Sequence, residues 1–344
     1  MINNFRPRLK PDEAEMLEKY RAIKRTANEM DMDDKNVKHG WIKNKTASLF
    51  FKNPNFKTED QQGFETMKQE IIDSISNHVP KYIPIDREEV IEGHLLVVDP
   101  ADIHIGKLCE AFDTGEDYNC QIAVQRVREG VQGIIRKAKG FNIDKILFIG
   151  GNDILHIDTP NRTTTGGTNQ DTDGMWYSNF LTAKKLYVEI LEMLLPIADV
   201  HFTFNPSNHD YMSGFFLADV IQTCFKDSKN ITFDCSIAHR KGFLYGKNLI
   251  GTTHGDGAKQ QDLPLLMAAE FPIEWSQSKH RYIYTHHIHH KSAKDYVGIT
   301  VESLRSPSGS DSWHHKKGYL SIKAVEGFIH HKEFGQVARL THIF

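Results

Sequence analysis

The chain has 344 residues, of which 39% are hydrophobic and 25% are charged. This is an ordinary globular composition, and the length suffices for one large domain with an appendage or for two medium domains. No apolar run approaches the roughly 18 to 20 residues that a membrane span needs, and the N-terminal residues lack the apolar core of a signal peptide. These features argue against a membrane protein, and we expect a soluble, cytoplasmic one.

The net charge of −3 is unevenly distributed. Residues 1–57 contain 13 Lys and Arg against 8 Asp and Glu, whereas the remainder contains 29 against 37. A basic head on an acidic body hints that the head contacts a polyanion, although a charge bias can equally mark a solvated surface. The four cysteines form no C-x-x-C pair, so we expect reduced, partly buried thiols at Cys109, Cys120, Cys224 and Cys235.

The first part of the chain predicts a basic, helical accessory region. Residues 11–28 have helical periodicity and are followed by a polar break and a basic segment at 37–45. Together they could form a small helix-turn-helix-like reader of nucleic acid, or equally an arm that docks on the main domain. A second helix is predicted from Thr58 to about His78.

Two prolines in residues 79–84 mark the clearest domain boundary. We therefore predict an accessory region at 1–84 and a main domain at 85–344. In the main domain, apolar strands first alternate with amphipathic helices, which predicts a layered α/β fold. These elements are strand 94–99, helix 118–139, strand 145–149, helix 175–195 and strand 200–204.

After residue 230 the pattern changes to short β segments with one helical insert at 258–271. The predicted strands are 231–233, 241–245, 249–253, 281–284, 296–301, 319–323 and 337–342. The chain has no internal repeat and no low-complexity tract.

Five polar motifs each follow directly after a predicted strand, where layered α/β folds build their sites. They are Asp102–Gly106, Gly150–His156, Ser207–Asp210, Thr253–Asp256 and Tyr284–His290. Singly, each has an ordinary explanation as a turn or a helix cap. Together, in this order and on strand ends, they predict one shared site.

The fifth motif contains four histidines in five residues. If the segment is extended, His287 and His289 point to the same side and offer two nitrogen ligands from one short stretch of backbone. The alternatives are a different register, with His286 and His290 as the ligands, and a solvated histidine-rich loop without metal.

The residue types suit the hydrolysis of a phosphate ester. Two metal ions about 3.5 to 4 Å apart can share a hydroxide and hold the phosphoryl oxygens, which requires a bridging carboxylate and several further ligands. Mixed imidazole, carboxylate and amide ligands suit Mn²⁺, Fe²⁺ or Zn²⁺. A leaving alkoxide also needs an acid, and a histidine with a near-neutral pKa can serve.

The five motifs resemble the signature of the calcineurin-like metallophosphoesterase superfamily, D-x-H, G-D, G-N-H-D/E, H and G-H-x-H, over about residues 95–291. The resemblance implies a metallophosphoesterase fold with two β-sheets packed between helices. It also implies that one metal is held by Asp102, His104 and His289, that Asp153 bridges, and that the other is held by Asn208, His254 and His287. His209 would be the general acid and Asp210 a neighbour that orients it.

The chain departs from the family pattern at three glycines, which are replaced by Asn152, Ser207 and His286. If the first departure displaces the bridging role, Asp158 is the alternative bridging residue.

The G-D-x-x-H spacing at Asp153 and His156 resembles the DNA-repair exonuclease branch of the superfamily, in which that histidine lies near the scissile phosphate. The alternative is a structural, hydrogen-bonded histidine. Arg162, in the polar loop 161–170, could contact a nucleic-acid backbone, although such loops are often simply solvated.

We therefore predict a two-metal phosphodiesterase that hydrolyses nucleic acid, with DNA favoured, as an exonuclease or endonuclease. A metal-bridging hydroxide would attack the phosphorus in line, and His209 would protonate the leaving oxygen. Two Mn²⁺ ions are favoured, with Fe²⁺, Zn²⁺ or Mg²⁺ as alternatives. The other hypotheses are a phosphatase or small-molecule phosphodiesterase with the same site, and a nucleic-acid-binding module with a degenerate site. The resemblance also implies an ATPase partner or a homodimer.

Overall fold

The computed structural model describes residues 21, 24, 25, 29, 37–43, 48–53, 59–77, 82–88 and 90–344. The chain divides into two compact units, Met1–Lys68 and Gln69–Phe344. This division falls within α2 (Glu59–Asn77), a helix whose ends agree with the sequence prediction to within a residue. A functional boundary near residue 84 remains a prediction.

The first unit contains a β-hairpin. Strands β1 (His39–Lys43) and β2 (Ser48–Lys52) pair antiparallel, with Trp41 opposite Phe50 and their ring centroids 5.2 Å apart. Cross-strand aromatic pairs of this kind stabilise a hairpin. Within the basic segment, His39–Lys43 form a strand where a helix-turn-helix would have its second helix. Nearly all of the helix predicted at 11–28 lies outside the described residues, so the role of this region remains a prediction.

The second unit contains a six-stranded sheet in the order β13-β12-β3-β4-β5-β6. The four strands β3 to β6 are parallel, so their carboxyl ends meet at one edge, whereas β12 runs antiparallel to both of its neighbours, β3 and β13. The strands are β3 (His94–Asp99), β4 (Ile143–Gly151), β5 (Asp199–Asn205), β6 (Ile231–Asp234), β12 (Ala324–His331) and β13 (Gly335–Ile343).

A second, five-stranded sheet has the order β10-β11-β9-β8-β7. Its three central strands β8, β9 and β11 are parallel to one another, and the edge strands β7 and β10 are antiparallel to their neighbours. The strands are β7 (Arg240–Tyr245), β8 (Asn248–Thr253), β9 (His280–Thr285), β10 (Ser292–Tyr296) and β11 (Ile299–Ser303).

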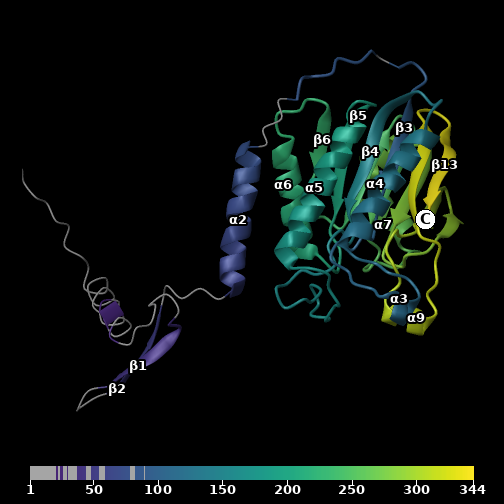
Figure 1. Ribbon diagram of the computed structural model, residues 1–344. Coiled ribbons are helices and arrows are strands. Elements are labelled where there is room, and N and C mark those ends of the chain that lie inside the picture. The colour runs from purple at the N-terminus through teal and green to yellow at the C-terminus, as the bar shows by residue number, and fades with distance from the viewer. Residues whose placement is uncertain are drawn as a thin grey trace, which may run out of the picture. The chain divides into compact units, whose positions relative to one another are not determined.

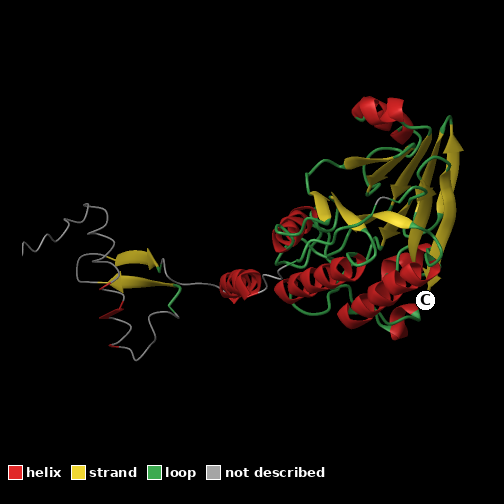
Figure 2. Ribbon diagram, turned by 90° about the horizontal axis from the view of Figure 1, so that it is seen from above, coloured by secondary structure: helices red, strands yellow, loops and turns green. Residues whose placement is uncertain are grey.

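The two sheets pack face to face between layers of helices, as Figures 1 and 2 show. Successive side chains of β8 point to opposite faces of the five-stranded sheet. Ile250 joins the core between the two sheets, and Leu249 packs with Met267 on the face that the helices cover. The six-stranded sheet is covered by α4 (Cys120–Lys137), α5 (Trp176–Leu194) and α6 (Tyr211–Cys224), and the other sheet by α7 (Leu263–Glu270) and α8 (Pro272–Gln277). The predicted layered α/β fold, with two sheets between helices, is confirmed.

Several elements differ from the sequence predictions. Strand β12 was not predicted, because buried Glu326 and His330 interrupt its apolar pattern; Glu326 is neutralised by Arg305 and Arg339. The predicted strand 296–301 covers the end of β10, the turn at 297–298 and the first residues of β11, and 319–323 is irregular. Helix α6 and the short helices α3 (Ala111–Thr114) and α9 (Ser312–Lys317) were also missed.

All four cysteines are free, as predicted, with Cys109 buried. Among the described residues, no helix combines the length and apolar character needed to cross a membrane.

Candidate metal centre

The loops that follow β3, β4, β5, β8 and β9 meet at one edge of the two sheets. The sheets are tied together there: the buried carboxylate of Asp99, at the end of β3, lies 3.0 Å from Nε2 of His286, just beyond β9. The backbone N–H of His287 donates to Asp102, and the side-chain amide of Asn205 donates to the carbonyl of Thr252. All five sequence motifs therefore contribute to the same region, as the strand-end argument predicted.

Three buried side chains form what we call the inner cluster: Asp102, His104 and His289. Their ligand atoms all lie within 4.8 Å of one another. The Nε2 atoms of His104 and His289 are 3.2 Å apart, and Nε2 of His289 is 3.7 Å from Oδ1 of Asp102. Two imidazole nitrogens and a carboxylate that converge on one point suit a divalent transition-metal ion.

A second set, the outer cluster, consists of Asp153, His254 and His287, again with ligand atoms within 4.8 Å of one another. Asn208 adds an amide oxygen, because its Oδ1 lies 2.9 Å from Nε2 of His254. Nδ1 of His254 is buried, has no hydrogen-bond partner in the described part of the chain, and lies 3.9 Å from Oδ1 of Asp102. The donor set and this unpaired nitrogen fit a second divalent ion.

Asp153 lies between the two clusters. Its Oδ2 is 3.2 Å from Nε2 of His254 and 3.9 Å from Nε2 of His104, so one carboxylate oxygen faces imidazoles of both. The alternative bridging residue, Asp158, is engaged elsewhere: it accepts hydrogen bonds from the backbone N–H groups of Met212 and Ser213 at the start of α6. Of these two carboxylates, Asp153 is the one that faces both clusters.

The choice of register in the histidine-rich stretch is also decided by contacts. His286 is occupied by Asp99 and the carbonyl of Thr253, and exposed His290 contacts the carbonyl of Ile288. The pair brought to the clusters is His287 and His289, although not for the reason given by an extended segment. Both have left-handed backbone conformations, with φ of 72° and 57°, so a turn orients them.

Left-handed backbone is concentrated at this centre. Seven non-glycine residues in the described part of the chain have positive φ, and five of them are the cluster members Asp102, His104, Asp153, His287 and His289. Each such residue costs roughly 1 kcal/mol or more relative to ordinary backbone. The geometry of the loops is thus set by what the side chains must reach, at some expense in stability.

The three departures from the family's glycines each have a structural explanation. Asn152 has φ of 53°, a conformation that glycine adopts freely and asparagine tolerates. Ser207 accepts a hydrogen bond from the backbone N–H of Asp153 at 2.7 Å and donates one to Asp210 at 2.6 Å. His286 forms the buried pair with Asp99 described above.

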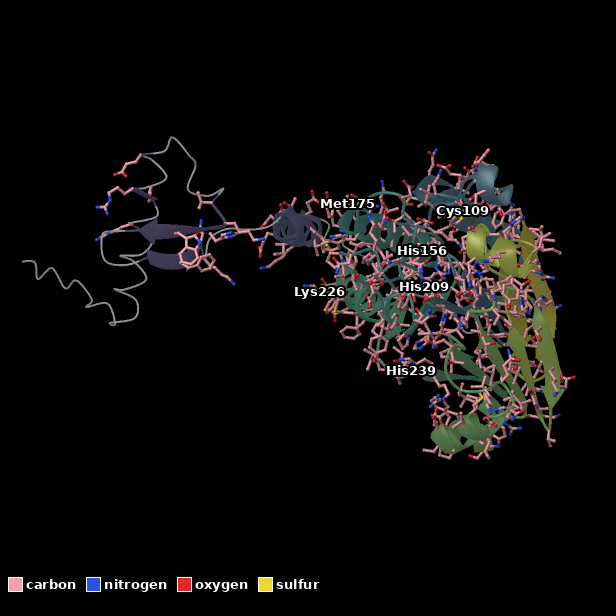
Figure 3. The ribbon with its side chains drawn as sticks, turned by 90° about the horizontal axis from the view of Figure 1, so that it is seen from below. Cys109, His156, Met175, His209, Lys226 and His239 are labelled. Carbon is pink, nitrogen blue, oxygen red and sulfur yellow. The ribbon has the colours of Figure 1, made fainter. Side chains whose placement is uncertain are left out.

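His209 lies beside both clusters and is only partly buried. Its backbone N–H donates to Oδ1 of Asp153 at 3.0 Å, and its Nδ1 lies 2.8 Å from the carbonyl oxygen of His156. Because a carbonyl oxygen only accepts hydrogen bonds, Nδ1 carries a proton. Nε2 is therefore the ring nitrogen that can transfer a proton to or from another molecule. Figure 3 shows His156 and His209 close together, and their rings stack with centroids 5.2 Å apart.

The side chains of His156 and Asp210 are both buried behind this surface. Nδ1 of His156 lies 3.3 Å from Nδ1 of His104, so this ring backs the inner cluster. Asp210 accepts hydrogen bonds from Ser207 and from the backbone N–H of Leu155. It therefore positions the loop that carries Asp153, and no hydrogen bond from its side chain to His209 is present among the described residues.

Burial and mutual charge dominate the electrostatics. Burial raises the pKa of Asp102 to about 7, although His254 and His286 oppose the shift. Burial also favours a higher pKa for Asp153, but His254 and His209 outweigh it and hold that pKa below its usual range. Conversely, burial would lower the pKa of His254, yet Asp153 and Asp102 raise it to about 9.

The inner imidazoles behave differently. Burial, reinforced by neighbouring imidazoles and Lys107, lowers the pKa of His104 and of His289 well below the usual value. Both are neutral near pH 7, which is the state that binds metal.

The sequence did not single out three residues next to the inner cluster. Lys107 is buried and pairs with Asp311 at 2.9 Å, and Asp311 also lies 2.6 Å from Nδ1 of His314. The ring of His314 stacks on His289 with centroids 5.1 Å apart. The basic run at 314–317 beside Trp313 was the available signal. By contrast Arg162, which sequence reasoning did name, is exposed on its loop.

No protein-family model matches the sequence, and no curated protein matches it either. Among solved structures, similarity to a novel archaeal phosphodiesterase covers 73% of this chain and 99% of that one, at 9% identity and a TM-score of 0.34. Similarity to Vps29 from Entamoeba histolytica in complex with zinc covers 72% of this chain and 98% of that one, at 10% identity and a TM-score of 0.30. Similarity to a putative 5'-nucleotidase from Staphylococcus aureus covers 73% of this chain and 54% of that one, at 8% identity and a TM-score of 0.36. Likeness at this level does not assign a family.

Proposed function

We propose that this chain is a two-metal phosphodiesterase of the calcineurin-like type that hydrolyses nucleic acid, with DNA favoured. The observation that carries the proposal is the position of Asp153, whose Oδ2 faces His254 at 3.2 Å and His104 at 3.9 Å. A single buried carboxylate between two convergent sets of ligands is what a dinuclear hydrolytic centre requires. A degenerate binding module would have no need to keep every proposed ligand in this arrangement.

The inner cluster would hold one ion, and the outer cluster with Asn208 the other. Mixed nitrogen and oxygen donors favour Mn²⁺, with Fe²⁺, Zn²⁺ or Mg²⁺ as alternatives. When bound, two such ions neutralise phosphoryl oxygens and lower the pKa of water, so that a nucleophile forms near neutral pH. The Asp210–Ser207 hydrogen bonds fix the loop that presents Asp153, and the Asp99–His286 pair fixes the turn that presents His287 and His289.

His209 has the geometry of a general acid. The carbonyl of His156 holds its Nδ1, so Nε2 can give a proton to a leaving oxygen, and its partial exposure leaves it accessible to substrate. The side chain of His156 contributes less directly, because the hydrogen bond to His209 comes from its backbone carbonyl and its ring only stacks on that of His209.

The preference for nucleic acid is supported by the His156 spacing and by exposed Arg162 on the neighbouring loop. Arg162 suits a phosphate contact that positions a strand without reading its sequence. The second candidate is a phosphatase or small-molecule phosphodiesterase with the same centre.

The test is hydrolysis by the purified protein of single-stranded DNA, duplex DNA, RNA and an aryl phosphodiester, each in Mn²⁺, Mg²⁺ and Zn²⁺. We expect a polynucleotide to be preferred over the aryl diester, and its binding to weaken as salt rises. Preference for a monoester, or equal use of all diesters, would favour the second candidate.

The acid assignment is tested with His209→Ala and two leaving groups. The variant should lose about 10²- to 10⁴-fold in kcat on a polynucleotide, whose alkoxide leaving group needs a proton, and far less on a p-nitrophenyl diester. Equal losses on both substrates would contradict the assignment. His156→Ala, which keeps the backbone carbonyl, is the matched control and should lose less.

A further inference from the structure

A cavity of about 410 Å³ opens beside the inner cluster, lined by residues 288–291, Arg305 and parts of 309–323. His289 forms part of its wall, and His314, stacked on His289, forms another part. The segment around α9, which Figure 1 places at one end of the unit, supplies most of the remaining wall. The cavity therefore begins at an inner-cluster residue and extends away from it, and its volume suits a group the size of one nucleotide.

Cationic side chains surround this cavity. Among the described residues, exposed Lys291 has no hydrogen-bond or ion-pair partner for its side chain, and the ammonium group of Lys323 donates to the hydroxyl of Ser310 at 2.9 Å. Arg305 also lines it, although its charge is shared with Glu326. Such a wall favours a ligand with negative charge.

Aromatic surface lies next to the cations. Tyr319 lines the cavity and is 49% exposed, and Trp313, 57% exposed, lies with its ring centroid 5.5 Å from that of Tyr319. Neither ring is used in the core, and exposed Leu320 and Ile322 widen the apolar side. Exposed aromatic side chains beside lysines that have no carboxylate partner suit a ligand with both a ring and an anion.

These features separate the candidate ligands. A phosphorylated peptide would use the cations and leave Trp313 and Tyr319 idle, and an apolar peptide would leave the cations uncompensated. An unpaired nucleotide uses both, because its base can stack on an aromatic ring while its phosphate meets a lysine. Bases in a duplex have their faces covered and could not stack in this way.

We propose that the cavity binds an unpaired nucleotide of a single-stranded polynucleotide, with the base on Trp313 and Tyr319 and a flanking phosphate at Lys291 and Lys323. This deepens the proposed function and rests on it for the position of the scissile phosphate at the clusters. It assigns the chain a preference for single-stranded DNA, or for frayed duplex ends, over closed duplex.

The test compares a Trp313→Ala/Tyr319→Ala variant and a Lys291→Ala variant with the wild-type chain. Matched controls are Phe334→Ala and Lys139→Ala, because both residues are exposed and lie at the edge of the six-stranded sheet opposite the clusters. Two readouts are used: kcat/KM on a single-stranded oligonucleotide and on an aryl phosphodiester, and the anisotropy of a labelled oligothymidine in EDTA, in which no turnover occurs.

Stacking on aromatic side chains is worth about 1 to 3 kcal/mol per base, so the double aromatic variant should lose tenfold or more in kcat/KM and in affinity for the oligonucleotide. Its activity on the aryl diester should stay within about twofold of wild type, which also shows that the centre is folded. An oligonucleotide with an abasic site next to the cleaved bond should be a poor substrate for wild type and equally poor for the variant.

The two proposals fail in different ways. If wild type hydrolyses neither substrate in any metal, the proposed function is wrong, and the anisotropy measurement alone then decides whether the cavity binds single strands. If wild type is active but the cavity variants behave like the controls on both readouts, the nucleotide site is overturned. Stronger binding of a phosphopeptide than of the oligonucleotide, lost in Lys291→Ala alone, would also overturn it.

Discussion

The inner and outer clusters draw ligands from one turn after β9, yet they differ in their access to solvent. His289 is buried in the inner cluster, whereas His287, two residues earlier, is partly exposed in the outer one. The inner imidazoles are held neutral by burial, but His254 of the outer cluster faces two carboxylates that raise its pKa to about 9. The inner cluster thus offers neutral, buried imidazoles to a metal ion, whereas the outer cluster would have to lose the proton of His254 before binding one.

The largest loss of activity is expected from a substitution at Asp153, which lies between the two clusters. Asp153→Asn keeps the size of the side chain but removes the charge that both ions would share. Hydrolysis of an aryl phosphodiester should fall by about 10³-fold or more, and metal analysis should show fewer than two ions per chain. Retention of two ions with near-normal turnover would mean that Asp153 does not bridge.

Two variants test the difference between the clusters directly: His289→Ala removes an imidazole from the inner cluster, and His287→Ala removes one from the outer cluster. After dialysis against buffer without metal, His287→Ala should keep about one ion per chain, because the inner cluster is intact and buried. His289→Ala should keep less than one ion per chain, and the affinity of its inner site for metal should fall by 10- to 100-fold or more. Equal losses in the two variants would show that the sites do not differ.

The proton held by His254 predicts a pH dependence for the outer site alone. Below its folded-state pKa of about 9 the ring is protonated and cannot act as a ligand, so raising the pH frees it for metal. Between pH 7 and 9, outer-site affinity should rise by up to tenfold per pH unit, whereas inner-site affinity should be nearly flat above the pKa of Asp102, about 7. Binding of the outer ion should release the proton of His254, and calorimetry in buffers of different ionisation enthalpy measures that proton release. Binding of a second ion without proton release would contradict the assignment.

The smallest effect is expected outside both clusters. Arg162→Ala removes one exposed cation, so aryl diester hydrolysis should be unchanged and oligonucleotide binding should weaken by a few fold at most. The slope of log affinity against log salt should become shallower by about one. An unchanged slope would show that Arg162 does not touch the strand.

The edge of the sheet and the residues gathered at it were accessible from sequence because both follow from short-range patterns. Apolar runs end at Asp99, Gly151 and Thr285, and polar residues follow at once, so the strand-end rule placed five loops together. His287 and His289 do lie at the clusters, but the predicted reason is wrong, because left-handed backbone rather than an extended strand orients them.

What sequence could not give depends on long-range pairing. Strand β12 carries Glu326, and nothing local predicts that Arg305 and Arg339 neutralise it, so the strand was missed. The same holds for the cavity wall around α9, where Lys107 and His314 meet through Asp311 although they lie far apart in the chain. Asp210 could be recognised as a supporting residue, but only the fold reveals that it supports Asp153.

The positive φ angles at the centre have a consequence for engineering this chain. Asp102, His104, Asp153, His287 and His289 hold unfavourable backbone conformations together with buried, mutually perturbing charges. A laboratory screen that rewards heat resistance alone, without metal or substrate, will favour glycine or apolar replacements at these five positions, and its best survivors will be inert. Thermostable working variants should instead be sought with metal present, or at surface positions remote from the two clusters.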